Sequence, residues 1–233
     1  MLWAGCDSST PGGAISPATS GASAPAPPTS AAALEPPRAP EIIVDRARAE
    51  VGKDRVTAGP GLADRAGALL RGAPGIQGRV VDVVAMRPAS PSDVATMVEL
   101  LRQAGAGAIH VKTEARDSTT QELPIATATR LPDCATVAWI AKDASIEVWP
   151  AGGGTAKRVL RGLAGPDLTL GMEAMHKQGS ECEASQIAVG ADDSMTWGLA
   201  FDLATTALHQ TWTRADAAVL VTGATPGRKV VLP

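Results

Sequence analysis

The composition of the chain changes abruptly near residue 41, and this change limits where a core can form. Residues 7–40 consist mainly of Ala, Pro, Ser, Gly and Thr. A segment of this kind buries too little apolar surface to offset the entropy lost on ordering, so we expect it to be disordered. It would span about 30 Å as a flexible coil and about 100 Å in an extended polyproline form. The segment is therefore expected to be a tether, or else a tail with no anchoring role.

Residues 41–115 have the pattern of a small α/β domain. Short apolar runs predict strands over 42–44, 50–57, 80–86 and 108–111. Residues 62–70 have helical spacing, which ends near Gly72 and Pro74. A second helix is expected from Pro91 to about Gly105, with an apolar face formed by Val94, Met97, Val98 and Leu101.

Residues 133–225 predict a second domain with the same order of elements. Strands are expected over 134–140, 145–149, 186–189 and 217–221, with 156–160 as an extension of the sheet. Asp167 is a suitable N-cap for a helix over 168–178. The buried face of a further helix is formed by Trp197, Ala200, Phe201, Ala204 and Leu208.

These patterns predict a chain of two similar domains after a tail. We expect residues 1–40 to be the tether, 41–115 the first domain, 116–132 a polar linker and 133–225 the second domain. Each domain is expected to be β-β-α-β-α-β, a mixed sheet with two helices, so the fold class is α/β (α+β). The repeat depends on element order, because direct identity between the halves is low.

Charge and hydropathy exclude two classes of function. The net charge is −3 and the isoelectric point is near 5.6, and no basic stripe or aromatic platform suggests a nucleic-acid surface. No run approaches 18 apolar residues, so no segment of this sequence is expected to span a membrane as a helix.

The start of the chain, from Leu2 to Asp7, suggests a membrane anchor of another kind. Ala4, Gly5 and Cys6 resemble the lipobox of bacterial lipoproteins, in which a signal peptide is cleaved before a Cys that is then acylated. Trp3 stands where that motif usually has Leu. The resemblance implies lipidation of Cys6 and attachment to the periplasmic face of a bacterial membrane. The alternative is an ordinary free thiol in a cytoplasmic protein.

Two further cysteines bear on whether the protein resides in an oxidising or a reducing compartment. Cys134 and Cys182 can form a disulfide in an oxidising compartment, and the loop they would close is worth about 4 kcal/mol in the chain-entropy model. In a reducing cytosol they would be two thiols. The sequence has no Cys-x-x-Cys motif, so a redox or zinc role for these residues is not expected.

The segments over 80–86, 92–104 and 109–113 resemble the last strand, helix and strand of the periplasmic domain of the ExbD/TolR biopolymer transport family. The stretch from Val189 to Asp193, followed by Trp197 and Gly198, resembles the same strand-to-helix junction in the second half. The resemblance implies a non-enzymatic envelope protein with tandem domains of this type, accessory to TonB/Tol-type energy transduction or transport. Members that couple proton flow carry an N-terminal membrane helix with a protonatable Asp, and this sequence shows no such helix.

That reading implies a set of partners. We expect binding to an envelope protein or to the cell wall through exposed sheet edges or a domain face. Membrane contact would come through lipid on Cys6, with no nucleic acid, cofactor or metal, and a homodimer is left open.

The alternative is a small envelope enzyme with a site between the domains. Asp192 and Asp193 form an acidic pair that could act in acid/base chemistry or could cap the helix that follows. His110, His176 and His209 have no partner at metal-ligand spacing. The glycine-rich stretch before Lys157 is not expected to be a phosphate loop, because Lys157 is followed by Arg158 where that loop has Ser or Thr.

Overall fold

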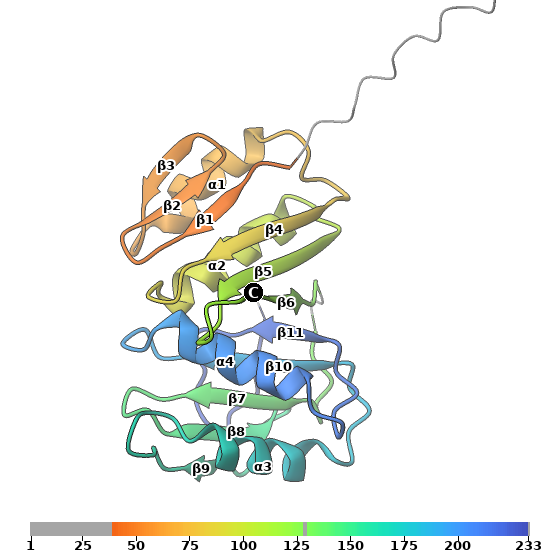
Figure 1. Ribbon diagram of the computed structural model, residues 1–233. Coiled ribbons are helices and arrows are strands. Elements are labelled where there is room, and N and C mark those ends of the chain that lie inside the picture. Colours follow the sequence, from red (N-terminus) through yellow and green to blue (C-terminus); the bar gives the residue numbers. More distant parts are fainter. Residues whose placement is uncertain (1–38, 128–129, 233) are drawn as a thin grey trace, which may run out of the picture. The chain divides into compact units, whose positions relative to one another are not determined.

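The computed structural model describes residues 39–127 and 130–232, and Figure 1 shows their arrangement. The described residues form four helices and a single mixed sheet of eleven strands. The α/β class is confirmed. The prediction of two separate domains is wrong, because the sheet runs without interruption in the order β3-β2-β1-β4-β5-β6-β11-β10-β7-β8-β9.

The N-terminal half of the sheet follows the predicted pattern closely. Its elements are β1 (Ile42–Val44), β2 (Arg48–Val51), β3 (Asp54–Thr57), α1 (Leu62–Gly72), β4 (Val80–Ala85), α2 (Pro91–Gln103) and β5 (Ala108–Glu114). The strand expected over 50–57 is instead two strands. Gly52 has a φ of 63°, a left-handed conformation that suits a tight turn, so β2 and β3 form a hairpin.

The C-terminal half has the same order of elements. They are β7 (Thr136–Ile140), β8 (Ile146–Pro150), β9 (Lys157–Val159), α3 (Leu168–Gly179), β10 (Gln186–Ala191), α4 (Trp197–Leu208) and β11 (Ala217–Leu220). Asp167 caps α3 as expected, because its Oδ1 accepts a hydrogen bond from the backbone N–H of Leu170 at 3.0 Å.

The two halves share one strand topology. Each begins with an antiparallel three-stranded meander, and its first strand then pairs in parallel with the strand after the first helix. That strand pairs in parallel with the last strand of its half. The halves are therefore structural repeats, each with one more strand than the predicted β-β-α-β-α-β order.

The segment predicted to be a linker joins the two halves of the sheet. It contains β6 (Thr120–Ile125), which pairs antiparallel with β5 over six residue pairs. On its other side β6 meets β11 at one pair, Ile125 with Ala218. The polar composition of 116–132 concealed a strand because the side chains of Thr120, Gln121 and Glu122 are exposed.

The helices of both halves pack against the same face of the sheet. Residue pairing from β4 to β10 places Val81, Ile125 and Ile187 on one face, and all three belong to the core that also contains residues of α2, α3 and α4. Because the sheet twists strongly between β6 and β11, α1 and α2 lie behind the strands of the N-terminal half in Figure 1, whereas α3 and α4 lie in front of those of the C-terminal half. The other face of the C-terminal half carries Val137, Trp139 and Val221, which form a separate apolar cluster with Val230 and Leu232 from the end of the chain. An extended segment without helix or strand thus covers this face.

The outer strands of the sheet are protected against pairing with another chain. β3 has four residues and β9 has three, and charged side chains such as Asp54, Arg55, Lys157 and Arg158 lie along them. Short charged edges disfavour strand addition. The edges are therefore poor docking sites, and the faces of the sheet and its helices are the better candidates.

Candidate functional site

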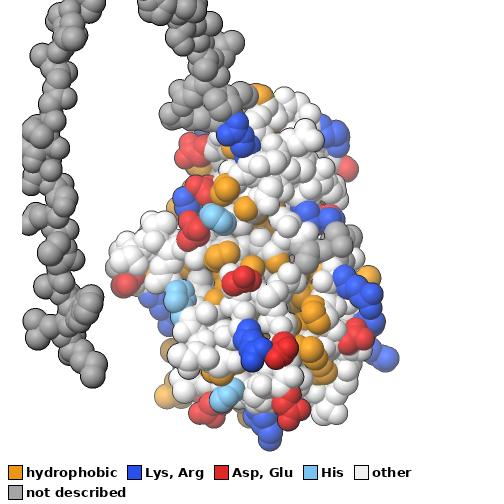
Figure 2. Space-filling view, turned by 90° about the vertical axis from the view of Figure 1, so that its right-hand side faces the viewer, with side chains coloured by type: hydrophobic (Ala, Val, Ile, Leu, Met, Phe, Trp, Pro, Cys, Tyr) orange, Lys and Arg blue, Asp and Glu red, His pale blue; other side chains and the backbone are white. Residues whose placement is uncertain are grey.

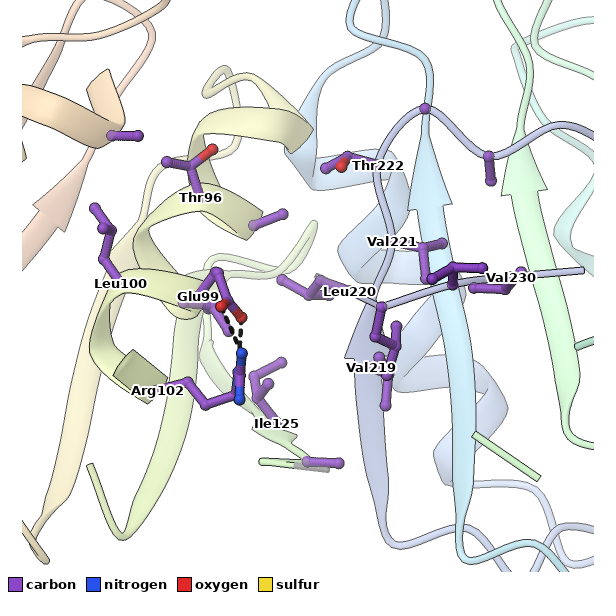
Figure 3. Close-up of a pocket in the computed structure, with 18 of the residues that line it drawn as sticks. Thr96, Glu99, Leu100, Arg102, Ile125, Val219, Leu220, Val221, Thr222 and Val230 are labelled. Carbon is purple, nitrogen blue, oxygen red and sulfur yellow. Dashed lines mark hydrogen bonds and ion pairs between the residues drawn. The ribbon is translucent and has the colours of Figure 1, made fainter. Parts of the chain in front are cut away.

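A groove lies between α2 and the C-terminal segment (residues 222–232), beside the point where β6 meets β11. Its volume is about 490 Å³, and its two walls are shown in Figure 3. The labelled lining residues are Thr96, Glu99, Leu100, Arg102, Ile125, Val219, Leu220, Val221, Thr222 and Val230. Ile125 and Leu220 lie between the walls, so the groove runs along the junction of the two halves of the sheet.

The helical wall is well formed for reasons visible in its sequence. Pro91 occupies the first turn, where its missing N–H is not needed, and Asp93 and Arg102 place opposite charges at the two ends as the helix dipole favours. Val94, Met97 and Leu101 are fully buried against the sheet. This leaves the neighbouring face of α2, with Thr96 and Leu100 among others, to line the groove.

One ion pair is the main polar feature of this wall. Arg102 donates from Nε and Nη2 to the two carboxylate oxygens of Glu99, at 2.7 and 2.6 Å, and Gln103 donates to Oε1 at 2.8 Å. Burial acts to raise the pKa of Glu99, but the hydrogen bonds from Arg102 and Gln103 outweigh it and the pKa lies below its usual value. The groove therefore presents an ionised carboxylate whose oxygens are already hydrogen-bonded.

The opposite wall is held by hydrogen bonds to β8 and to the loop between β8 and β9. The indole Nε1 of Trp149 donates to the carbonyl of Arg228 at 2.9 Å, and the backbone N–H of Val230 donates to the carbonyl of Ala151 at 2.8 Å. Gly154, with a φ of 149°, donates to the carbonyl of Gly227 at 2.9 Å. The glycine-rich loop before Lys157 thus anchors the chain end and does not form a phosphate loop.

A buried hydrogen-bond chain locks the two halves together. The indole Nε1 of Trp197 donates to Oγ1 of Thr113 at 2.8 Å, and that hydroxyl donates to the carbonyl of Ala85 at 2.9 Å. The backbone N–H of Trp197 also donates to the carbonyl of Ala89 at 2.8 Å. Trp197 is 1% exposed, so the first residue of α4 is part of the core between the halves.

A cluster of ion pairs near the surface also holds the two halves together. Arg87 donates from both terminal nitrogens to the carboxylate of Asp202, at 2.9 and 2.8 Å, and Arg116 donates to the same carboxylate at 2.8 Å. Such a bidentate pair fixes orientation as well as distance. The loop after β4 is therefore held against α4, which fixes the position of α2 at the groove.

The acidic pair predicted as a candidate acid/base site is not assembled as a pair. Oδ1 of Asp192 accepts from the backbone and hydroxyl of Ser194, at 3.0 and 2.6 Å, and these bonds lower its pKa. Asp193 accepts from the hydroxyl of Ser90 at 3.3 Å. Neither residue caps α4, because its N-cap position is Thr196. A carboxylate held ionised by its own turn does not suit general acid chemistry.

Asp93 is a buried carboxylate that the sequence analysis did not single out. It is 5% exposed, and both of its oxygens accept from the backbone N–H of Gly59 at 3.1 Å. Burial raises the pKa of Asp93, the bond from Gly59 acts against this, and the nearby charge of Asp193 raises it further. Its position within a helical pattern gave no sign that the loop before α1 would cover it.

Replacing Asp93 with Asn is expected to change how stability depends on pH. Because the folded-state pKa is raised, protonated Asp93 stabilises the fold below the unfolded pKa, and this contribution is lost as pH rises through the folded value. The amide introduced by Asp93→Asn would still accept from Gly59 but would not titrate. The stability of the wild type relative to Asp93→Asn should therefore rise on acidification from about pH 7 to about pH 4, measured by urea unfolding at each pH. A relative fall would contradict the assignment.

The remaining predicted site residues lie apart from the groove. Cys134 and Cys182 are joined in a disulfide with Cα atoms 5.7 Å apart, linking the turn before β7 to the loop after α3. Cys6, the predicted lipidation site, lies outside the described residues. His176 stacks on Trp212, with ring centroids 5.4 Å apart, and Nδ1 of His209 contacts the carbonyl of Thr205 at 2.7 Å. These contacts are structural ones.

His110 is the exception among the histidines. Its ring lies beside Asp82 and Glu122, and these three side chains form the one His/Cys/Asp/Glu group within residues 39–127 and 130–232 that could hold a metal ion. Linear spacing missed the group because its members come from three different strands. Only the pairing of those strands brings them together.

The surface and the helices set further limits. Figure 2 shows Lys and Arg interspersed with Asp and Glu on the side that it presents, with no area dominated by positive charge. Within the described part of the chain, no helix has the length and apolar character needed to cross a membrane. Comparisons with protein-family models, with characterised proteins and with solved structures found no match.

Proposed function

We propose that the protein is a non-catalytic binding module of the bacterial cell envelope, held at the periplasmic face of a membrane by lipid on Cys6. Its tandem ExbD/TolR-like halves suit an accessory role in TonB/Tol-type energy transduction or transport. The observation that carries the proposal is the groove between α2 and the C-terminal segment. Its volume of about 490 Å³ lies in the range of established ligand sites.

The lining of the groove favours a peptide segment of an envelope protein over cell-wall glycan. Leu100, Ile125, Leu220 and Val221 provide aliphatic contacts, and none of the described residues that line it is aromatic. Glu99 with its partners offers a single polar anchor. Aliphatic grooves of this kind bind the apolar side chains of helices or extended peptides.

The disulfide supports the proposed location at the periplasmic face of a membrane. Structural disulfides persist in oxidising compartments such as the periplasm and are rare in the cytosol. The Cys134–Cys182 bond thus agrees with the lipobox-like start of the chain and weighs against the cytoplasmic alternative. The enzyme alternative has less support, because Asp192 and Asp193 bond to different partners.

Site-specific cross-linking in living cells tests this function. A photoreactive amino acid at Thr96, on the groove wall, should cross-link to one envelope protein. The same amino acid at the exposed Lys177 on α3 is the matched control and should not. Filling the groove with Thr222→Trp should abolish the Thr96 product, and Cys6→Ser should release the protein from the membrane fraction.

Three results would overturn parts of the proposal. Identical products from Thr96 and Lys177 would remove the groove as the binding site. Cross-links to peptidoglycan from Thr96 would replace the protein partner with the cell wall. Membrane association that is unchanged in Cys6→Ser would remove the lipid anchor.

A further inference from the structure

The exposed face of the N-terminal half carries a group of charged side chains that pairing of the strands brings together. On β4 and β5, Val81, Val83 and Val111 point into the core, so the alternating residues point outwards. Asp82 lies directly opposite His110, and Lys112 lies directly opposite Glu122 on β6. The backbone register therefore fixes all four side chains on one face.

The distances in this group are those of a metal site that is nearly closed. Nδ1 of His110 lies 2.9 Å from Oε1 of Glu122 and 3.8 Å from Oδ1 of Asp82. One ligand atom from each of the three residues lies within 4.8 Å of the other two. Ligands at about 2.1 Å around tetrahedral zinc are separated by about 3.4 Å, so rotation of exposed side chains can complete the geometry.

We propose that Asp82, His110 and Glu122 bind a divalent transition-metal ion of the zinc class. One imidazole nitrogen and two carboxylate oxygens are a ligand set that zinc accepts, and they leave a fourth position for water or for a group from a partner. The side chains are 47%, 29% and 44% exposed, so the ion can enter from solvent.

Lys112 shapes this site without occupying it. Its Nζ lies 2.5 Å from Oδ2 of Asp82 and 3.9 Å from Oε2 of Glu122, whereas His110 faces the other oxygen of each carboxylate. A metal bound at the His110 side leaves the two oxygens beside Lys112 for this outer hydrogen bonding.

The positive charge of Lys112 also weakens the site. It neutralises part of the carboxylate charge that would attract the ion, so the site is tuned for moderate affinity. This gives a prediction that separates a metal site from an ion-pair network. If the group only stabilises the sheet, removing Lys112 simply breaks a salt bridge. If it binds metal, Lys112→Met should bind zinc about tenfold more tightly.

Zinc binding to the full-length protein, treated with chelator and carrying Cys6→Ser to remove a competing thiol, tests the site. Competition with a chromophoric chelator should give one ion per chain. His110→Ala and Asp82→Asn should each weaken binding at least about tenfold, as expected when a metal ligand is lost, while His176→Ala is the matched histidine control and should bind as before. Cobalt substitution should give the visible absorption of a low-coordinate site with a nitrogen ligand.

Amide chemical shifts show independently where zinc binds. Zinc should move the signals of residues in β4, β5 and β6 and leave those of the groove-lining helix α2 unchanged. Each substituted side chain is at least partly exposed, so circular dichroism should show that the variants retain the fold. Equal affinity in wild type and His110→Ala, or shifts centred elsewhere, would overturn the proposal. Since this face is distinct from the groove, either result leaves the proposed function unaffected.

Discussion

Trp197→Ala should lower the free energy of unfolding by about 4 kcal/mol, in the range for removing a buried aromatic side chain. Trp197 is fully buried at the start of α4, and the centroid of its ring lies 6.0 Å from that of Phe201. The substitution leaves a cavity between the halves and removes the indole donor to Thr113. Chemical unfolding followed by circular dichroism measures the change without depending on the fluorescence of the lost residue.

Two further variants show whether the loss comes from this position. Trp197→Phe retains most of the packing but not the hydrogen bond, so we expect a loss of about 1 kcal/mol from the missing bond and somewhat more from imperfect filling. Trp212→Ala removes a half-buried ring stacked on His176 and should cost less than Trp197→Ala. A larger effect at Trp212 would mean that the junction is not the main point of contact between the halves.

Removing the disulfide should cost a similar amount by a different mechanism. The bond closes a loop between residues separated by 48 positions, and the chain-entropy model assigns such a loop about 4 kcal/mol through its effect on the unfolded state. The double variant Cys134→Ser/Cys182→Ser should therefore unfold at a lower denaturant concentration, and reduced wild type should behave like it. Denaturant unfolding with and without a reductant measures both.

Cys6→Ser serves as the control for this experiment, since Cys6 is not part of the bond. It should unfold at the same denaturant concentration as the wild type. A change below about 1 kcal/mol in the double variant would show that the cross-link constrains the unfolded chain less than the loop model assumes.

Local patterns predicted most of the individual elements. The apolar run from Val80 and the helical spacing after Pro91 became β4 and α2 within one or two residues, because each buries its apolar positions against the same core. The hairpin of β7 and β8 and the capping by Asp167 were also found correctly. These features depend on neighbouring residues, which a single sequence displays.

Features that depend on distant residues were missed. β6 has exposed polar positions along half its length, so nothing in its composition indicated that it would join the two halves of the sheet. The groove required α2 and the end of the chain to meet beside the junction of β6 and β11, and the group around His110 required three strands in a particular register. Periodicity fixes which face of an element is buried, but not which other element covers it.

The position of β1 has a mechanical consequence for the proposed anchor at the N-terminal side of the chain. β1 lies inside the sheet, with three residue pairs to antiparallel β2 and three to parallel β4. A pull on the chain ahead of Ile42 acts along the strand, so both sets of hydrogen bonds must shear together and cannot open one after another. Resistance to such a pull is governed by the unfolding barrier. Under the proposed anchoring through lipid on Cys6, a load between membrane and bound partner would enter the fold in the direction in which its hydrogen bonds act together.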